Sequence, residues 1–320
     1  MDKTINISTA LNERYVPYTY TMLFSLFTSN PGTRVRVFLL FGELSEGSLA
    51  DFRELGERFN NDIVFCNIDK SSLPEDLPVG EKWQLEIYFR LFLTDILPPD
   101  IDRLLYLDGD IIVNKPLDDL YDTDFEGAHL VVCKDMGISE DNIEWHKNAR
   151  AEGLRHIIDT QTYFNSGVML MNIELLREFC PPQTYLDVAK EFDYQIFAPD
   201  QDLLNYVHYG HVKYADPHKY DLLTDIARDR GESYDSVIDE TVIYHYTGDK
   251  PWAGDRIHYD IEKVWWDYAL ETPYREWLRD KFISECICGG GVKDLVQGLR
   301  SDLRTAIDSF NKLRSLIGNM

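Results

Sequence analysis

Residues Arg103–Ile112 read RLLYLDGDII, an apolar run followed by two aspartates that one glycine separates. The run is typical of a buried strand, and Asp108 and Asp110 stand at its carboxyl end. Two carboxylates so close repel each other and lose hydration, so we expect a positive partner beside them. In an extended segment residues i and i+2 point the same way, which would let both side chains reach one ion. Their oxygens would suit Mg²⁺ or Mn²⁺.

Around this stretch the N-terminal third alternates short apolar runs with helical patterns. The alternation predicts an α/β fold with a parallel sheet and helices on both faces. Ligands bind such sheets at the carboxyl ends of the strands, where the two aspartates stand. The expected strands are 4–9, 35–41, 62–68 and 103–108, and the expected helices are 16–27, 45–59 and 83–95. No G-x-G-x-x-G follows the first strand and no G-x-x-x-x-G-K-[ST] occurs in the chain, which argues against a dehydrogenase or a P-loop enzyme.

The rest of the chain supplies further candidate groups. We expect strands at 129–133, 163–173 and 241–246, and helices at 142–152, 182–192 and 200–208. The polar, glycine-containing entry Asn165-Ser166-Gly167 suits a backbone that approaches a ligand closely. Asp200 stands where a helix N-cap is expected. His245 ends the last strand, and an imidazole added to Asp108 and Asp110 would shift the choice of metal toward Mn²⁺.

Composition narrows the class of protein. The 320 residues are 44% hydrophobic, as in a globular protein, and the net charge of −24 argues against nucleic acid as a partner. A negatively charged small substrate would need a bound cation or local basic residues. We expect the five cysteines to be reduced. The first residues do not resemble a signal peptide and no window resembles a transmembrane helix, so we expect a cytoplasmic protein.

The C-terminal region differs from the rest. We predict a catalytic domain at 1–270 and a helical extension at 271–320, with an amphipathic helix at about 292–317 after the glycines 289–291. Its apolar stripe would pack on the body or on a second copy of the chain. The alternative is a peripheral helix at the inner face of a membrane, for which a net charge of about +2 is small.

Four motifs, YLDGDII, FNSGVMLMN, PDQDLLN and HYTGDKPW, occur in this order. Together they resemble glycosyltransferase family 8, over roughly Thr4 to Trp252. The resemblance implies a single Rossmann-like nucleotide-sugar-binding domain of glycosyltransferase A type, with a mostly parallel mixed sheet. It also implies a metal-dependent, retaining transferase that moves glucose or galactose from a UDP-sugar to a saccharide, lipopolysaccharide or protein-linked glycan.

The resemblance assigns roles by position. The implied metal ligands, for Mn²⁺ or Mg²⁺, are Asp108, Asp110 and His245. The implied catalytic residues are Gln201, Asp200 and Asn165. The implied substrate-binding residues are Thr9, Ala10, Asn12 and Tyr15 for uridine, Gly248 and Lys250 for the diphosphate, and Arg90, Asp108, Gly109, Asn165, Ser166, Asp200 and Gln201 around the donor. One position departs from the pattern, because many relatives have an aspartate where this chain has Asn12.

Several alternatives stay open at this point. Retention of configuration could proceed through a covalent glycosyl intermediate or through attack on the face that the diphosphate leaves. Because an amide is a poor nucleophile, Gln201 favours same-face attack. The rival classes are a metal-dependent phosphohydrolase, a non-catalytic sugar-nucleotide-binding scaffold and a self-glycosylating protein.

Overall fold

The structure is a computed structural model that describes residues 3–70, 73–75, 77–79 and 84–288. The amphipathic helix predicted at 292–317 lies outside the described residues. Among the described residues, no helix combines the length and the apolar character needed to cross a membrane.

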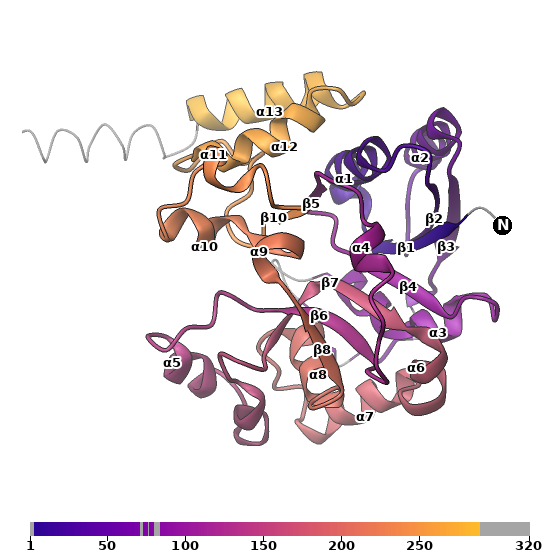
Figure 1. The fold of residues 1–320 in the computed structure, drawn as a ribbon, viewed down its shortest axis with the longest axis vertical. Coiled ribbons are helices and arrows are strands. Elements are labelled where there is room, and N and C mark those ends of the chain that lie inside the picture. Colours follow the sequence, from indigo (N-terminus) through magenta and orange to yellow (C-terminus); the bar gives the residue numbers. More distant parts are fainter. Residues whose placement is uncertain (1–2, 71–72, 76, 80–83, 289–320) are drawn as a thin grey trace, which may run out of the picture.

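A seven-stranded mixed sheet forms the centre of the molecule (Figure 1), in the order β3-β2-β1-β4-β7-β6-β8. Its strands are β1 Thr4–Ala10, β2 Arg34–Phe41, β3 Asp62–Asn67, β4 Arg103–Leu107, β6 Leu130–Lys134, β7 Phe164–Asn172 and β8 Val212–Ala215. The strands β3, β2, β1 and β4 are parallel neighbours, and β6 pairs in parallel with β8. Only β7 runs antiparallel to its neighbours β4 and β6. The mostly parallel mixed sheet predicted from the sequence is therefore confirmed.

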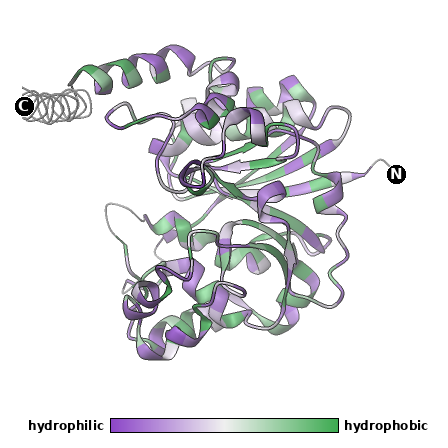
Figure 2. Ribbon diagram, turned by 60° about the vertical axis from the view of Figure 1, so that its left-hand side comes forward, coloured by the Kyte–Doolittle hydropathy of each residue, from purple (hydrophilic) through white to green (hydrophobic). Residues whose placement is uncertain are grey.

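Helices cover both faces of the sheet. On one face, α1 (Val16–Ser29) and α2 (Glu46–Phe59) pack on a hydrophobic cluster that includes Leu105 and Leu107 of β4. On the other face, α6 (Ile173–Phe179), α7 (Pro182–Glu191), α8 (Pro199–Val207) and the 3₁₀ helix η3 (Leu85–Phe92) pack on a cluster that includes Leu104 and Tyr106. Alternate residues of one strand thus enter opposite cores, because successive side chains of a strand point to opposite faces. In Figure 2 the strands of the sheet carry long hydrophobic stretches.

A second, three-stranded sheet was not predicted. Its strands are β5 (Ile111–Val113), β10 (Ile243–His245) and β9 (Leu222–Leu223). The strand predicted at 241–246 contains β10, but β5 and β9 are too short for a sequence pattern to indicate. In it His245 pairs with Ile111, the residue that follows Asp110. The small sheet therefore brings two segments that are more than 100 residues apart in sequence to the same point.

The helices α12 (Lys263–Ala269) and α13 (Arg275–Cys288) lie beside the small sheet at one end of the molecule (Figure 1). Leu278 of α13 is buried in one hydrophobic cluster with Trp265 of α12 and Tyr244 of β10. The first part of the predicted extension 271–320 thus packs on the body. The remaining short elements are η1 Glu13–Tyr15, α3 Leu93–Ile96, α4 Asp118–Tyr121, α5 Ile143–Asn148, η4 Glu152–Ile157, α9 Pro217–Tyr220, α10 Thr224–Asp229, α11 Tyr234–Val237 and η5 Asp260–Glu262.

The structure corrects two local predictions. Asp108, Gly109 and Asp110 do not continue the strand but turn between β4 and β5, because these two strands belong to different sheets. The helix predicted at 83–95 is the 3₁₀ helix η3 followed by the short α3. The apolar side chains of this segment would face the core in an α-helix as well as in a 3₁₀ helix, so the apolar pattern did not distinguish the two helix types.

Candidate active site

A cavity of about 570 Å³ opens at the carboxyl ends of β1 and β4. This is the edge at which ligands bind to parallel sheets. Its wall comes from the segment after β1, from η3, from the turn between β4 and β5, from the start of β7 and α8, and from the loop after β10. The residues predicted to bind substrate or metal that line it are Ala10, Asn12, Tyr15, Arg90, Asp108, Gly109, Asp110, Asn165, Ser166, Asp200, Gln201, His245, Gly248 and Lys250.

The turn that carries the two aspartates is fixed by close packing. The backbone N–H of Asp108 donates to the carbonyl of Gly167 over 2.9 Å. A Cβ at Gly109 would lie 2.6 Å from the Oγ1 atom of Thr19 in α1. Only glycine therefore lets the turn lie this close to α1, and the close approach sets the positions of the aspartates on either side.

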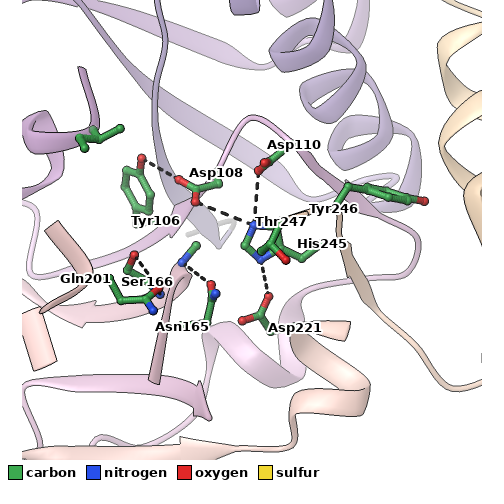
Figure 3. Close-up of polar contacts among 12 residues, drawn as sticks. Tyr106, Asp108, Asp110, Asn165, Ser166, Gln201, Asp221, His245, Tyr246 and Thr247 are labelled. Atoms are coloured by element: carbon green, nitrogen blue, oxygen red, sulfur yellow. Dashed lines mark hydrogen bonds and ion pairs between the residues drawn. The ribbon is translucent and has the colours of Figure 1, made fainter. Parts of the chain in front are cut away.

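His245 joins the two aspartates in one cluster (Figure 3). Its Nε2 atom lies 3.3 Å from Oδ1 of Asp110 and 3.9 Å from Oδ2 of Asp108, and its Nδ1 atom lies 2.8 Å from Oδ1 of the buried Asp221. Burial opposes protonation of the imidazole, but Asp221 and Asp110 outweigh it and raise the pKa of His245 to about 10. Asp221 also fixes the ring so that Nε2 faces the aspartates.

The backbone of Gly167 forms the floor beneath this cluster. A Cβ there would lie 2.2 Å from Cε1 of His245 and 2.9 Å from Oδ2 of Asp108. The glycine of the Asn165-Ser166-Gly167 segment thus leaves the space that the imidazole and the carboxylate occupy. The backbone here comes close to two side chains of the site, and the close approach to a ligand that the segment predicted stays a prediction.

Two basic side chains neutralise the aspartates. The Nζ atom of Lys250 lies 2.5 Å from Oδ2 of Asp110, and Nη2 of Arg90 lies 2.7 Å from Oδ1 of Asp108. Burial alone would raise the pKa of Asp110, but Lys250 and His245 hold it well below its usual range. Each carboxylate therefore has a basic partner that the protein itself supplies.

Arg90 connects the turn to the start of α8. Besides Asp108, its guanidinium contacts Oδ2 of Asp200 at 3.2 Å and the carbonyl of Ser166 at 2.8 Å. Burial raises the pKa of Asp200, and Arg90 opposes that rise. Asp200 also accepts a hydrogen bond from the Ser166 hydroxyl over 3.2 Å.

Gln201 and Asn165 lie on the same side of the cavity. The Gln201 amide donates to Oδ2 of Asp135 over 2.9 Å, and its oxygen accepts from the backbone N–H of Ser166 over 3.0 Å. Asn165 accepts from the backbone N–H of Gly167 over 2.8 Å. Both amide groups are thus held in fixed orientations.

The residues predicted to bind the nucleotide differ in their positions relative to the cavity. Ala10 and Tyr15 line the cavity, and the Tyr15 ring makes edge contacts with Tyr18 and Trp252. The Asn12 oxygen accepts from two backbone N–H groups and caps η1. Thr9 is fully buried and does not line the cavity, so the structure does not bring it together with the others.

Sequence reasoning missed three acidic residues of the site. Asp221 holds His245, Asp135 holds Gln201, and Asp225 lies so close to Gly248 that a Cβ there would be 2.2 Å from its Oδ2 atom. Asp221 directly precedes β9 and Asp225 lies in α10, in a segment whose sequence carries no motif. For Asp135 the one available signal was its position two residues after the predicted strand 129–133, at the same edge as Asp108.

Residues 6–256 match the family described as Glycosyl transferase family 8. The chain belongs to this family. It is 28% identical over 262 residues to a lipopolysaccharide 1,2-glucosyltransferase of Escherichia coli, covering 78% of this chain and 74% of that protein. It is 26% identical over 251 residues to a lipopolysaccharide 1,3-galactosyltransferase of Salmonella typhimurium, covering 77% and 72%.

Solved structures confirm the A-type glycosyltransferase fold. The galactosyltransferase LgtC, solved with donor and acceptor sugar analogues, has a TM-score of 0.67 at 24% identity, over 87% of this chain and 100% of that chain. The glycosyltransferase GlyE of Streptococcus pneumoniae has a TM-score of 0.64 at 19% identity, over 88% and 64%. The resemblance drawn from the four motifs is confirmed, and the protein is a family 8 glycosyltransferase.

This family implies a divalent metal, and the cluster fits one. One ligand atom each from Asp108, Asp110 and His245 lie within 4.8 Å of one another. Two hard carboxylates with one imidazole form a donor set suited to Mn²⁺ or Mg²⁺. Asp221, hydrogen-bonded to the far ring nitrogen, is the outer partner that metal-binding histidines usually have.

Proposed function

We propose that this glycosyltransferase is a retaining, metal-dependent enzyme that transfers a hexose from a UDP-sugar to a saccharide, lipopolysaccharide or protein-linked glycan. The observation that carries the proposal is the joint placement of Asp108, Asp110 and His245 beside Lys250 in one cavity, with Gln201 and Asp200 also in its wall. A metal and a lysine suit a diphosphate, whereas fixed amides and carboxylates suit sugar hydroxyls.

The diphosphate would be bound where the protein concentrates positive charge. Asp108, Asp110 and His245 would hold Mn²⁺ or Mg²⁺, which when bound supplies positive charge to the departing diphosphate. Lys250, which contacts Asp110 in the structure, would also bind a phosphate oxygen. These cations explain how a chain with a net charge of −24 would bind a polyanionic donor.

The uridine would occupy the part of the cavity near β1. Tyr15 is 36% exposed, and its ring is nearly perpendicular to those of Tyr18 and Trp252 and stacks on neither, so we propose that it stacks on the base. Ala10 leaves room beside it. Asn12 would contribute less than a free side chain, since its oxygen already caps η1.

The hexose would lie against Arg90, Asn165, Asp200 and Gln201. Asp200 directly precedes Gln201, and Arg90 and Ser166 hold its Oδ2 atom. The Gln201 amide is a weak nucleophile and is tied to Asp135. Both observations favour attack by the acceptor on the face that the diphosphate leaves, with Gln201 stabilising positive charge on the sugar.

The donor sugar and the acceptor are proposed from the relatives. Glucose or galactose and a lipopolysaccharide acceptor are named for the proteins of Escherichia coli and Salmonella typhimurium. We propose the same classes of sugar and acceptor here, with the reaction in the cytoplasm and, for a lipid-linked acceptor, at the inner face of the membrane.

The test is a panel of nucleotide sugars incubated with the full chain, with Mn²⁺ and with a chelator, following release of nucleoside diphosphate. We expect release from one UDP-hexose, lost with the chelator and in Asp110→Ala. Asp119→Ala is the matched control, because that side chain is 82% exposed and outside the cavity. The anomeric configuration of the product, read by NMR, tests retention.

Other outcomes would identify the rival classes. Tight UDP binding without turnover, even with a range of saccharide acceptors, would indicate a scaffold. Release of phosphate from a simple ester would indicate a phosphohydrolase. A stepwise gain of hexose mass by the protein itself would indicate self-glycosylation.

A further inference from the structure

A second cluster of potential metal ligands lies on the face of the large sheet that α6, α7 and α8 cover. It consists of His129, Cys180 and His208, whose ligand atoms lie within 4.8 Å of one another. The two Nδ1 atoms are 3.1 Å apart, and the Cys180 sulfur lies 3.8 Å from that of His129 and 4.0 Å from that of His208. The three atoms form a compact triangle of two nitrogens and one sulfur.

These distances match tetrahedral zinc. With Zn–N bonds of about 2.05 Å and Zn–S bonds of about 2.3 Å, tetrahedral ligands would be separated by about 3.3 Å for N···N and about 3.6 Å for N···S. All three observed separations lie close to these values. Thiolate and imidazole are also the donors that zinc prefers, whereas Mg²⁺ and Mn²⁺ prefer oxygen.

Both imidazole rings are held with Nδ1 facing the cluster. The His208 ring is fully buried, and its Nε2 atom lies 2.8 Å from the hydroxyl of Tyr185 in α7. The His129 ring stacks with His211, at 4.8 Å between centroids, and with Phe179, at 6.2 Å. A hydrogen bond at the far ring nitrogen, as between Tyr185 and His208, is the usual support of a metal-binding histidine.

The two imidazoles of the cluster have lowered pKa values, whereas burial raises the pKa of the Cys180 thiol, which would have to lose its proton to bind zinc. Burial, together with His129 and His211, lowers the pKa of His208 to about 3, so this imidazole is neutral at neutral pH. Cys180 is free and 4% exposed. The triangle of donors, rather than this charge state, is the observation on which the inference rests.

We propose that His129, Cys180 and His208 form a second metal site that binds zinc and fastens the far ends of β6 and α8 to each other. His129 directly precedes β6, Cys180 follows α6, and His208 follows α8. At their other ends, β6 leads to Asp135 and α8 begins beside Gln201, and these two side chains are hydrogen-bonded in the active site. Zinc here would join the same two elements that position Gln201, with water as its fourth ligand. The inference does not depend on the proposed function.

The test uses the full chain with Asp108→Ala and Asp110→Ala, which remove the carboxylate ligands of the active-site cluster, stripped with a chelator and then loaded with Zn²⁺. We expect about one zinc per chain after gel filtration. Co²⁺ loading should give a thiolate-to-cobalt charge-transfer band, which the sulfur-free active-site cluster cannot produce. Zinc should also raise the melting temperature.

Added to this chain, Cys180→Ser should abolish the retained zinc, the charge-transfer band and the thermal shift. Cys133→Ser is the matched control, because Cys133 is equally buried and free but lies outside the cluster. His129→Gln is the second variant, since its half-buried side chain is a less disruptive site for substitution than Cys180. A chain with only the two aspartate substitutions that retains no zinc and shows no band, or a band that persists in both Cys180→Ser and His129→Gln, would overturn the proposal.

Discussion

At the scale of single residues, Asp221 is a positioning residue for His245. Its Oδ1 atom lies 2.8 Å from the imidazole Nδ1, and both groups are buried. We expect Asp221→Asn to lower the affinity for Mn²⁺ by about 10–100-fold, because the ring loses its charged partner. Calorimetric titration with Mn²⁺ measures this effect. Asp119→Asn, an exposed control, should leave the affinity unchanged, and an unchanged affinity in Asp221→Asn would refute the positioning role.

Gly167 should tolerate no side chain. An added Cβ would meet the imidazole of His245 at 2.2 Å, and that ring cannot move away because Asp221 holds it. We expect Gly167→Ala to reduce turnover by about 100-fold, since shifts near 1 Å at reacting groups have effects of that size. Steady-state kinetics measures the loss.

The control for this substitution is Gly47→Ala in α2, where an added Cβ would lie 3.8 Å from its nearest neighbour, the Ser45 hydroxyl. This change should leave turnover intact and stabilise the helix by about 0.5–1 kcal/mol. Equal turnover in the two variants would show that the space at Gly167 has no role in the site.

At the scale of elements, a buried ion pair anchors the start of α8. Arg150 donates from Nε to Oδ1 of Asp202 over 2.8 Å, and the Tyr163 hydroxyl donates to the same oxygen over 2.6 Å. The other oxygen of Asp202 accepts from the backbone N–H groups of Phe197 and Ala198, which precede α8. The network therefore fixes the helix turn that presents Asp200 and Gln201.

Removing the arginine should destabilise the protein strongly. We expect Arg150→Met to lower the free energy of unfolding by about 3–5 kcal/mol, because it leaves the Asp202 charge buried and unpaired. Urea denaturation measures the change. Lys147→Met, at a partly exposed position three residues earlier, should shift stability by no more than about 0.5 kcal/mol. A loss for Arg150→Met as small as that of this control would contradict the role of the network.

At the scale of the whole molecule, the question is whether α13 belongs to the same cooperative folding unit as the rest of the protein. Leu278 is fully buried against Trp265, although it lies beyond the predicted domain boundary at residue 270. We expect Leu278→Ala to lower the free energy of unfolding by about 2–5 kcal/mol in a single transition, because it opens a cavity in a shared core. Ile287→Ala, at a side chain 74% exposed, is the control. A separate early transition in Leu278→Ala would instead show that α13 unfolds independently.

Much of the architecture followed from local sequence patterns. The alternation of apolar runs and helical periods predicted β1, β2, β3 and β4 and the helices on both faces, because burial on both sides of a parallel strand leaves a continuous apolar run. The four motifs identified the family, which the match over residues 6–256 confirms. The predicted groups at the ends of strands, Asp108, Asp110 and His245, lie together in the cavity.

Other features depended on tertiary structure alone. The turn at Gly109, the pairing of His245 with Ile111 and the support of His245 by Asp221 all join segments distant in sequence. The same holds for the triangle of His129, Cys180 and His208, which come from the ends of three different elements. The sequence by itself determined which segments become strands and helices, since periodicity and turn residues act locally. Only the folded chain decided which side chains meet, because a contact between distant segments leaves no periodic trace in either of them.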